Sequence, residues 1–122
     1  MRKLLGLAAI AFMFVACSNS PEDVVKKCIS ATWKGDAKQV VKYLHFKSEA
    51  KKQKFIKSLM DEDYGKEYAD KNGGVKSIKT SLINEIENVA KVEALTVFKN
   101  GEFNYHIRDL VKIDGTWYLE ID

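Results

Sequence analysis

The hydrophobic periodicity of this chain changes once, at Gly73-Gly74. Before these glycines, apolar residues recur every three or four positions, as on one face of an amphipathic helix. After them, apolar and polar residues alternate, β-branched and aromatic residues are frequent, and proline is absent, which favours strands. The sequence therefore predicts an α+β fold, in which N-terminal helices pack on a curved antiparallel sheet of about four strands.

Residues 1–16 have the features of a secretory signal, so we do not expect them to belong to the fold. Arg2 and Lys3 give a basic start, and an apolar run of 13 residues follows, from Leu4 to Ala16. A run of this length is too short to cross a bilayer as a helix. The mature chain is therefore expected to begin at the next residue.

The segment Phe14-Val15-Ala16-Cys17 resembles the lipobox of bacterial lipoproteins, with Phe14 where leucine is usual. The resemblance implies that the Cys17 thiol receives a diacylglycerol, that the preceding peptide is removed, and that the new N-terminus is acylated. Two or three acyl chains would hold the protein on a membrane face, because each buried methylene contributes ~0.8 kcal/mol. An ordinary cleavage site, a Cys17–Cys28 disulfide and an uncut segment are the alternatives.

The lipobox implies a location in the bacterial cell envelope, with Cys17 as the lipid attachment site. In a Gram-negative host it favours the outer membrane, because Ser18 replaces the aspartate that retains enteric lipoproteins at the inner membrane. Residues 17–20 would form a short lipidated tether. Residues 21–122 would form a single domain, since about 100 residues are enough for one core and too few for two.

Removal of the signal nearly neutralises the chain, because two basic residues leave with it. The basic residues fall from 20 to 18 against 17 acidic ones, so the net charge becomes +1 and gives no reason to expect nucleic acid as a partner. His45 and His106 are isolated, so no metal site, no cofactor and no catalytic set is predicted. Cys28 lies in a helical pattern and is expected to be a small buried thiol rather than a reactive one.

Three helices are predicted in the first part of the chain. Ser20-Pro21-Glu22-Asp23 combines an N-cap serine, a proline at the first helical position and acids in the first turn, and Gly35 ends this helix. Asp36 caps the second helix, which has glutamine at the third position after the cap. The third helix runs from about residue 48 to residue 60 or 64.

Four strands are predicted after the glycines, over residues 75–86, 90–99, 102–113 and 116–121. Asn100-Gly101 is typical of a two-residue hairpin turn, which would pair Lys99 with Glu102. This register places three pairs on the inner face, namely Phe98 with Phe103, Thr96 with Tyr105, and Ala94 with Ile107. Apolar pairs on one face and opposite charges on the other are what cross-strand pairing favours.

The opposite, outer face of this hairpin is expected to be only partly polar. Leu95 and Val97 lie at its centre, beside Asn104 and His106. They form either a tolerated exposed surface or a shallow patch for a second copy of the chain. A homodimer through the outer sheet face is therefore one expectation for partners.

The turn at Asp114-Gly115 leaves two registers open. A two-residue turn pairs Lys112 with Trp117 and requires a bulge near Asp109, whose carboxylate then faces solvent. A three-residue loop pairs Val111 with Trp117, requires no bulge and points Asp109 inward. Trp117 lies in the core in both registers.

Three segments together resemble a family, and they are Ser20 to Val25, Ala31 to Asp36, and Leu110 to Trp117. They are similar to segments of the short bacterial lipoproteins of unassigned function that adopt the nuclear transport factor 2-like, cystatin-like fold. The resemblance covers about Ser20 to Ile121 and implies a curved antiparallel sheet wrapped around helices, enclosing a conical cavity. Cys28 stands where a larger aromatic residue is more usual, which would enlarge that cavity slightly.

Two classes of function follow from this sequence. The first is a lipid-anchored binding or interaction module of the cell envelope, non-catalytic, whose partner is an unknown small molecule or envelope protein. The alternative is a small cavity enzyme of the ketosteroid isomerase or dehydratase kind. In that enzyme Asp109 would be the base and Tyr105 the donor to the oxyanion, in a candidate pocket formed by Tyr105, Asp109 and Trp117. The fold alone does not choose between them.

Overall fold

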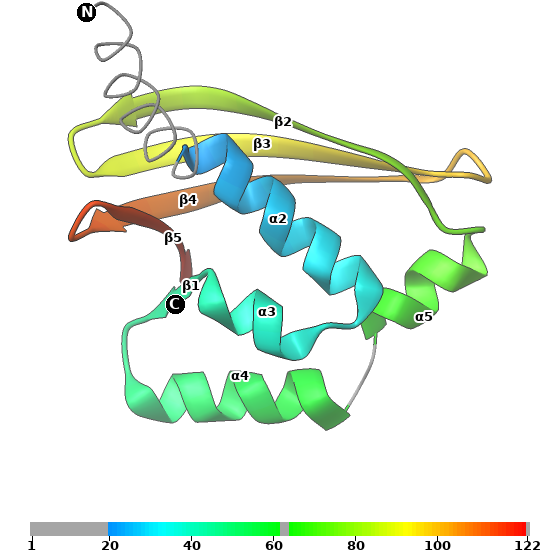
Figure 1. The fold of residues 1–122 in the computed structure, drawn as a ribbon, viewed down its shortest axis with the longest axis horizontal. Helices are drawn as coiled ribbons and strands as arrows, with labels where there is room; N and C mark the ends of the chain where they lie inside the picture. Colours follow the sequence, from blue (N-terminus) through cyan, green and yellow to red (C-terminus); the bar gives the residue numbers. More distant parts are fainter. Residues whose placement is uncertain (1–19, 62–63, 122) are drawn as a thin grey trace, which may run out of the picture.

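Helices cover one face of a five-stranded sheet in the computed structural model, which describes residues 20–61 and 64–121 (Figure 1). The elements are α2 (Pro21–Lys34), α3 (Ala37–Lys42), β1 (Leu44–Phe46), α4 (Glu49–Asp61), α5 (Tyr64–Lys71), β2 (Val75–Ile86), β3 (Val89–Phe98), β4 (Phe103–Ile113) and β5 (Thr116–Ile121). The α+β fold class is confirmed. The predicted signal and Cys17 lie outside the described residues.

The strand order is β1-β5-β4-β3-β2, in which β2 to β5 pair antiparallel with their neighbours. β1 was not predicted. It joins β5 in parallel, with Leu44 opposite Leu119 and His45 opposite Glu120. A strand of three residues is too short to show the alternation by which the other four were identified.

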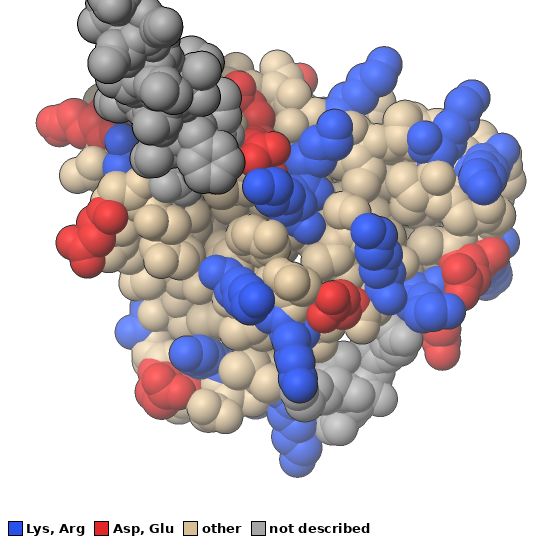
Figure 2. Space-filling model, viewed as in Figure 1, with Lys and Arg blue, Asp and Glu red and all other residues tan. Residues whose placement is uncertain are grey.

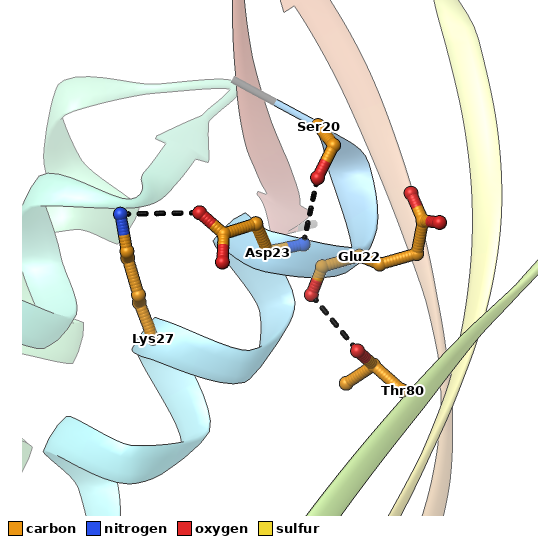
Figure 3. A network of polar contacts seen from close by, with 5 residues as sticks. All are labelled: Ser20, Glu22, Asp23, Lys27 and Thr80. Carbon is orange, nitrogen blue, oxygen red and sulfur yellow. Dashed lines mark hydrogen bonds and ion pairs between the residues drawn. The ribbon is translucent and has the colours of Figure 1, made fainter. Parts of the chain in front are cut away.

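The predicted start of α2 is confirmed, and it ties the helix to the sheet (Figure 3). The Ser20 hydroxyl accepts a hydrogen bond of 3.2 Å from the Asp23 amide, and Asp23 in turn forms an ion pair of 3.1 Å with Lys27. The Glu22 carbonyl accepts a hydrogen bond of 3.1 Å from the Thr80 hydroxyl of β2. The first turn of α2 is therefore held against the sheet as well as capped.

The third predicted helix is confirmed as α4, and a further helix, α5, follows it. Gly65, in the first turn of α5, lies so close to α2 that a Cβ atom there would overlap the Thr32 carbonyl. On the helix side of the molecule, basic side chains are spread over the surface with acidic ones between them rather than gathered in one patch (Figure 2). Among the described residues, no helix is long and apolar enough to span a membrane.

The core lies between α2 and the inner face of the sheet. Its buried side chains are Val24, Val25, Cys28, Ile29, Ala31, Val40, Ala90, Val92, Ala94, Leu110, Trp117 and Leu119. Trp117 is 4% exposed, so its predicted place in the core is confirmed.

The predicted register of the β3–β4 hairpin is wrong by one residue. The loop has three residues rather than two, because the Phe98 amide donates to the Glu102 carbonyl at 2.9 Å and Gly101 takes a φ of 94°. β3 and β4 therefore pair Val97 with Phe103 and Leu95 with Tyr105. A shift of one residue moves every side chain of a strand to the other face. Phe103, Tyr105 and Ile107 are consequently on the outer face.

The β4–β5 hairpin has the two-residue turn of the first option, with Asp114 at a φ of 51° and Gly115 at 81°. It pairs Lys112 with Trp117 and Leu110 with Leu119. The bulge expected near Asp109 is wrong, because β4 pairs with β3 without interruption from Val111 to Phe103. Once the β3–β4 register is corrected, Asp109 points outward without a bulge.

Candidate functional site

Three polar side chains follow one another on the inner face of β4, namely Asn104, His106 and Arg108. The cross-strand register pairs them with Thr96, Ala94 and Val92 of β3, which are all buried. Directly opposed residues share a face of the sheet, so this polar row lies on the same face as the core. Here we call these three residues of β4 the inner polar row.

The positive charge of Arg108 acts on two neighbouring groups, the Cys28 thiol and the His106 ring. Cys28 of α2 is buried in the core, and burial raises the pKa of its thiol to about 11, although the Arg108 charge partly opposes this shift. Burial and the Arg108 charge together lower the pKa of His106 below 6.5. Arg108 forms no ion pair with any residue that the structure describes. Arg108 is exposed, so water solvates its charge.

Asn104 carries a buried acceptor without a donor. Its Oδ1 atom has no hydrogen-bond partner among the described residues. The nearest strand neighbour, Thr96, already accepts a hydrogen bond of 3.2 Å from the indole nitrogen of Trp33. An unpaired buried acceptor costs about 1–3 kcal/mol, so such groups usually meet water or a ligand. The atom has almost no accessible surface, so an outside donor would reach it only if neighbouring side chains moved.

A second polar row crosses the outer face. Lys91 of β3 forms an ion pair of 2.8 Å with Asp109 of β4, and His45 of β1 pairs with Glu120 of β5 at 2.6 Å. Asn84 of β2 lies opposite Lys91. Asn84, Lys91, Asp109 and Glu120 line a hollow of about 280 Å³ together with Val89, Ala90, Leu110 and Val111. The polar residues of the hollow follow one another across the sheet, and the cross-strand pair Val89 and Val111 lies beside them.

The residues of the predicted pocket do not meet. Tyr105 is half exposed on the outer face, where its hydroxyl donates to Glu93 at 3.0 Å, and this hydrogen bond raises the pKa of Tyr105. Asp109 is on the same face, four residues or about 13 Å further along the strand. Trp117 is buried on the inner face, with the Lys112 ammonium 5.1 Å from its ring centroid. Tyr105 and Asp109 therefore lie on the opposite side of the sheet from Trp117.

Sequence reasoning missed the inner polar row because the register error exchanged the two faces of β4. The alternation of Asn104, His106 and Arg108 with apolar residues was visible in the sequence, but alternation does not say which face is buried. Among the described residues, no group of three histidine, cysteine or acidic side chains is arranged to hold a metal ion.

The fold is that of the NTF2-like proteins. A crystal structure from Campylobacter jejuni, described as a "Putative NTF2-like transpeptidase", matches with a TM-score of 0.74 and 24% sequence identity, over 85% of this chain and 100% of that chain. Residues 15–120 match the model of the domain of unknown function DUF4878, and the chain belongs to this family. A comparison with curated proteins finds no match.

Burial of Cys28 leads to a prediction about its reactivity. In a Cys17→Ala variant, where Cys28 is the single thiol, we expect native protein to react with iodoacetamide at pH 8 at least about 100-fold more slowly than unfolded protein. The reason is that a pKa of about 11 instead of 9.0 leaves about 100-fold less thiolate, and burial restricts access as well.

The same pKa difference gives a pH dependence of stability with a definite sign. The pKa of Cys28 is higher in the folded chain than in the unfolded chain. The contribution of Cys28 to the free energy of unfolding is therefore fully present below pH 9 and is lost as the pH rises towards about 11. Urea unfolding at pH 8, 9 and 10 should show a steeper fall for the Cys17→Ala chain than for the same chain with Cys28→Ala. Equal slopes, or rapid alkylation of the native protein, would show that Cys28 is exposed.

Proposed function

We propose that this protein is a lipid-anchored, non-catalytic module of the bacterial cell envelope that binds a ligand on the inner face of β4. The binding role depends on one observation above all, the buried Asn104 Oδ1 atom, which has no donor in the part of the chain that the structure describes. Arg108, four residues away on the same strand face, is exposed and has no ion-pair partner among the described residues, so it is available to a ligand. The anchor and the envelope location are supported by the lipobox pattern that ends at Cys17.

We also propose that the protein is not an enzyme, and the positions of Asp109 and Tyr105 support this. Asp109 forms an ion pair with Lys91 on an exposed face, and Tyr105 donates to Glu93, so both groups of the isomerase alternative are engaged elsewhere. The description of the Campylobacter jejuni protein names a transpeptidase, so transpeptidation is a further activity to consider for this chain. Acyl transfer by Cys28 would require its thiolate, which the raised pKa of that thiol opposes.

The anchor is tested by mass. We expect membrane fractions to hold a mature chain that begins at Cys17 and carries the mass of two or three acyl chains. A Cys17→Ala variant should remain as the full precursor without acyl mass, whereas Cys28→Ala, the matched control, should be processed and lipidated normally. A membrane-bound wild type with an unmodified Cys17 thiol would contradict the anchor.

The binding role is tested by locating where small molecules bind. With nitrogen-labelled protein, we expect a library of small polar compounds to shift the backbone amide signals of residues 104–108 and of Cys28 in NMR spectra. The bulky His106→Trp substitution should abolish these shifts, whereas Lys57→Gln, on the exposed side of α4, should leave them unchanged. If the whole library leaves residues 104–108 unshifted, or binds only at the outer hollow, the inner polar row is not the binding site.

The outer face of the sheet is proposed to bind a second copy of the chain. Phe103, Tyr105 and Ile107 are between 48% and 64% exposed, and they adjoin Leu95 and Val97 of β3. Three long strands at about 4.8 Å spacing, with the shorter β5 and β1, cover roughly 600 Å² in projection. Because side chains project from the sheet, the accessible area of such a face is larger than its projection and approaches the ~800 Å² that each partner buries in a standard interface.

Charges on this face support pairing with a second copy. Lys79 and Lys91 lie on β2 and β3, whereas Asp109 and Glu120 lie on β4 and β5. A two-fold axis along the strands would place Lys79 and Lys91 of one copy over the half of the other copy that carries Asp109 and Glu120, although Glu93 also lies on the β3 side. The surface therefore fits a second copy of the chain.

The dimer is tested by the molar mass in solution. We expect light scattering to report a dimer for the wild type and a monomer for Ile107→Glu, because the new carboxylate would be buried opposite Glu93, which has the same charge. Lys57→Glu, on the exposed side of α4, is the control and should remain dimeric. A monomeric wild type at concentrations near 100 μM would rule out a stable dimer.

A further inference from the structure

We propose that the free edge of β2 binds an extended peptide segment of a partner protein as an additional strand, with one apolar side chain of that peptide in a hollow beside Ile78. The binding surface is an edge of the sheet rather than either of its faces. The inference therefore does not rest on the binding roles proposed above.

β2 is the last strand of the sheet and has a neighbouring strand on one side only (Figure 1). Apart from its pairing with β3, no backbone group of β2 has a backbone hydrogen-bond partner in the described part of the chain. In an antiparallel pair, every second residue points its N–H and C=O groups away from the partner strand. β2 therefore presents a row of donors and acceptors whose spacing matches another extended backbone.

The regular part of this edge is the stretch from Ser77 to Leu82. Pairing with β3 is continuous over these residues, whereas register shifts interrupt it between Val75 and Ser77 and between Leu82 and Asn84. Such bulges limit pairing at an edge, so they set the length of the segment that can bind. A stretch of this kind is about 20 Å long, and about half of its residues turn both backbone groups towards the free edge.

A hollow of about 190 Å³ adjoins this edge on the inner side of the sheet. Its apolar lining, between polar residues of α2 and α5, is formed by Trp33, Ala69, Val75 and Ile78. Ile78 is opposite Thr96 of β3, which is buried, so a peptide residue beside Ile78 would share the inner face and stand at the hollow. A cavity of about 150 Å³ holds a benzene molecule, so this hollow has room for a leucine or phenylalanine side chain.

Two exposed lysines of β2, Lys76 and Lys79, favour acidic side chains on the peptide. Neither lysine forms an ion pair with a described residue. Lysines on an edge strand usually keep other strands away, but they attract a strand of opposite charge. Lys79 is opposite Leu95 on the outer face, so an acidic residue of the peptide is expected at an odd spacing from the apolar residue that faces inward.

A second copy of the chain fits this edge less well than a single peptide does. The first turn of α2 lies over the middle of the stretch, where the Glu22 carbonyl accepts a hydrogen bond from Thr80 (Figure 3). A symmetric pairing of two β2 edges would bring the acidic first turns of two α2 helices together at this point. These like charges would repel one another, whereas a peptide without a helix avoids the contact.

The sequence preference is tested by selection from a random library. The full chain, purified in lipid nanodiscs, is the target for displayed random octapeptides, and empty nanodiscs remove peptides that bind lipid or scaffold. We expect enriched peptides to have an apolar residue, an acidic residue one or three positions away, and no proline between them. No enrichment over empty nanodiscs, or enrichment of sequences without this alternation, would contradict the proposal.

Methylation of the peptide backbone tests whether the peptide binds as a strand. Two versions of an enriched peptide are compared, one with N-methyl groups on the odd residues and one with them on the even residues. A paired strand turns every second N–H group towards its neighbour, so one version should bind at least about tenfold more weakly than the parent and the other within about twofold of it. Equal affinities of the two versions would show that the peptide does not pair as a strand.

Hydrogen exchange and one variant locate the peptide on the molecule. Binding should slow the amide exchange of every second residue from Ser77 to Leu82 at least about tenfold. Ser30→Trp, which fills the hollow from α2, should weaken binding at least about tenfold, whereas the control Lys38→Trp, on the exposed side of α3, should not. If Ser30→Trp fails to fold, the wild-type exchange pattern and the methylated peptides decide. Protection at β1, the opposite edge of the sheet, in place of β2 would overturn the proposal.

Discussion

The hydrogen bond from the Phe98 amide to the Glu102 carbonyl determines which way every side chain of β4 points. This bond, 2.9 Å long, closes the β3–β4 hairpin on a loop of three residues. Asn100, inside the loop, donates through its side chain to Asn72 at 2.7 Å, so the loop is also attached to the end of α5. Because strand side chains alternate, a loop one residue shorter would exchange the two faces of β4.

Packing beneath the hairpin reinforces the same register. Phe98 is fully buried and meets the rings of Trp33 and Tyr68 edge to face, with centroids 5.1 and 5.3 Å away. Edge-to-face contacts of this kind contribute about 0.5–1.5 kcal/mol each beyond the burial of area. Phe98 in the core requires the even-numbered residues of β3 to face inward, and the hairpin then brings Asn104, His106 and Arg108 to that side. The polar row is therefore a consequence of core packing at the far end of the strand.

Much of the fold could be predicted because its signals are local. Ser20 and the proline after it mark the start of α2, and Asp114-Gly115 favours the turn that is observed. The hairpin register could not be predicted, because it depends on Asn72, which is distant in sequence from Asn100. Pairing Phe98 with Phe103 was attractive as an apolar contact, but Phe103 is instead 64% exposed.

The candidate site was missed for the same reason. Strand alternation separates Asn104, His106 and Arg108 from their apolar neighbours, but the usual assumption that polar residues face water places them on the wrong side. The sequence offers one further sign in Cys28, a small residue in the helix that covers this face. Its burial in the core beside the Arg108 charge became evident only once α2 and β4 were placed together.

The two faces of β4 do not follow the usual pattern, in which apolar side chains face the core and polar ones face water. Apolar Phe103 and Ile107 face outward, whereas charged Arg108 faces the core side. Exposing large apolar side chains and burying an unpaired acceptor both oppose stability. A domain of about 100 residues has only about 5–15 kcal/mol of net stability to withstand them. A second copy of the chain on the outer face, as proposed, would cover the exposed apolar side chains. The register of one hairpin thus decides which side chains stand on each face of β4, and both binding surfaces proposed on those faces depend on it.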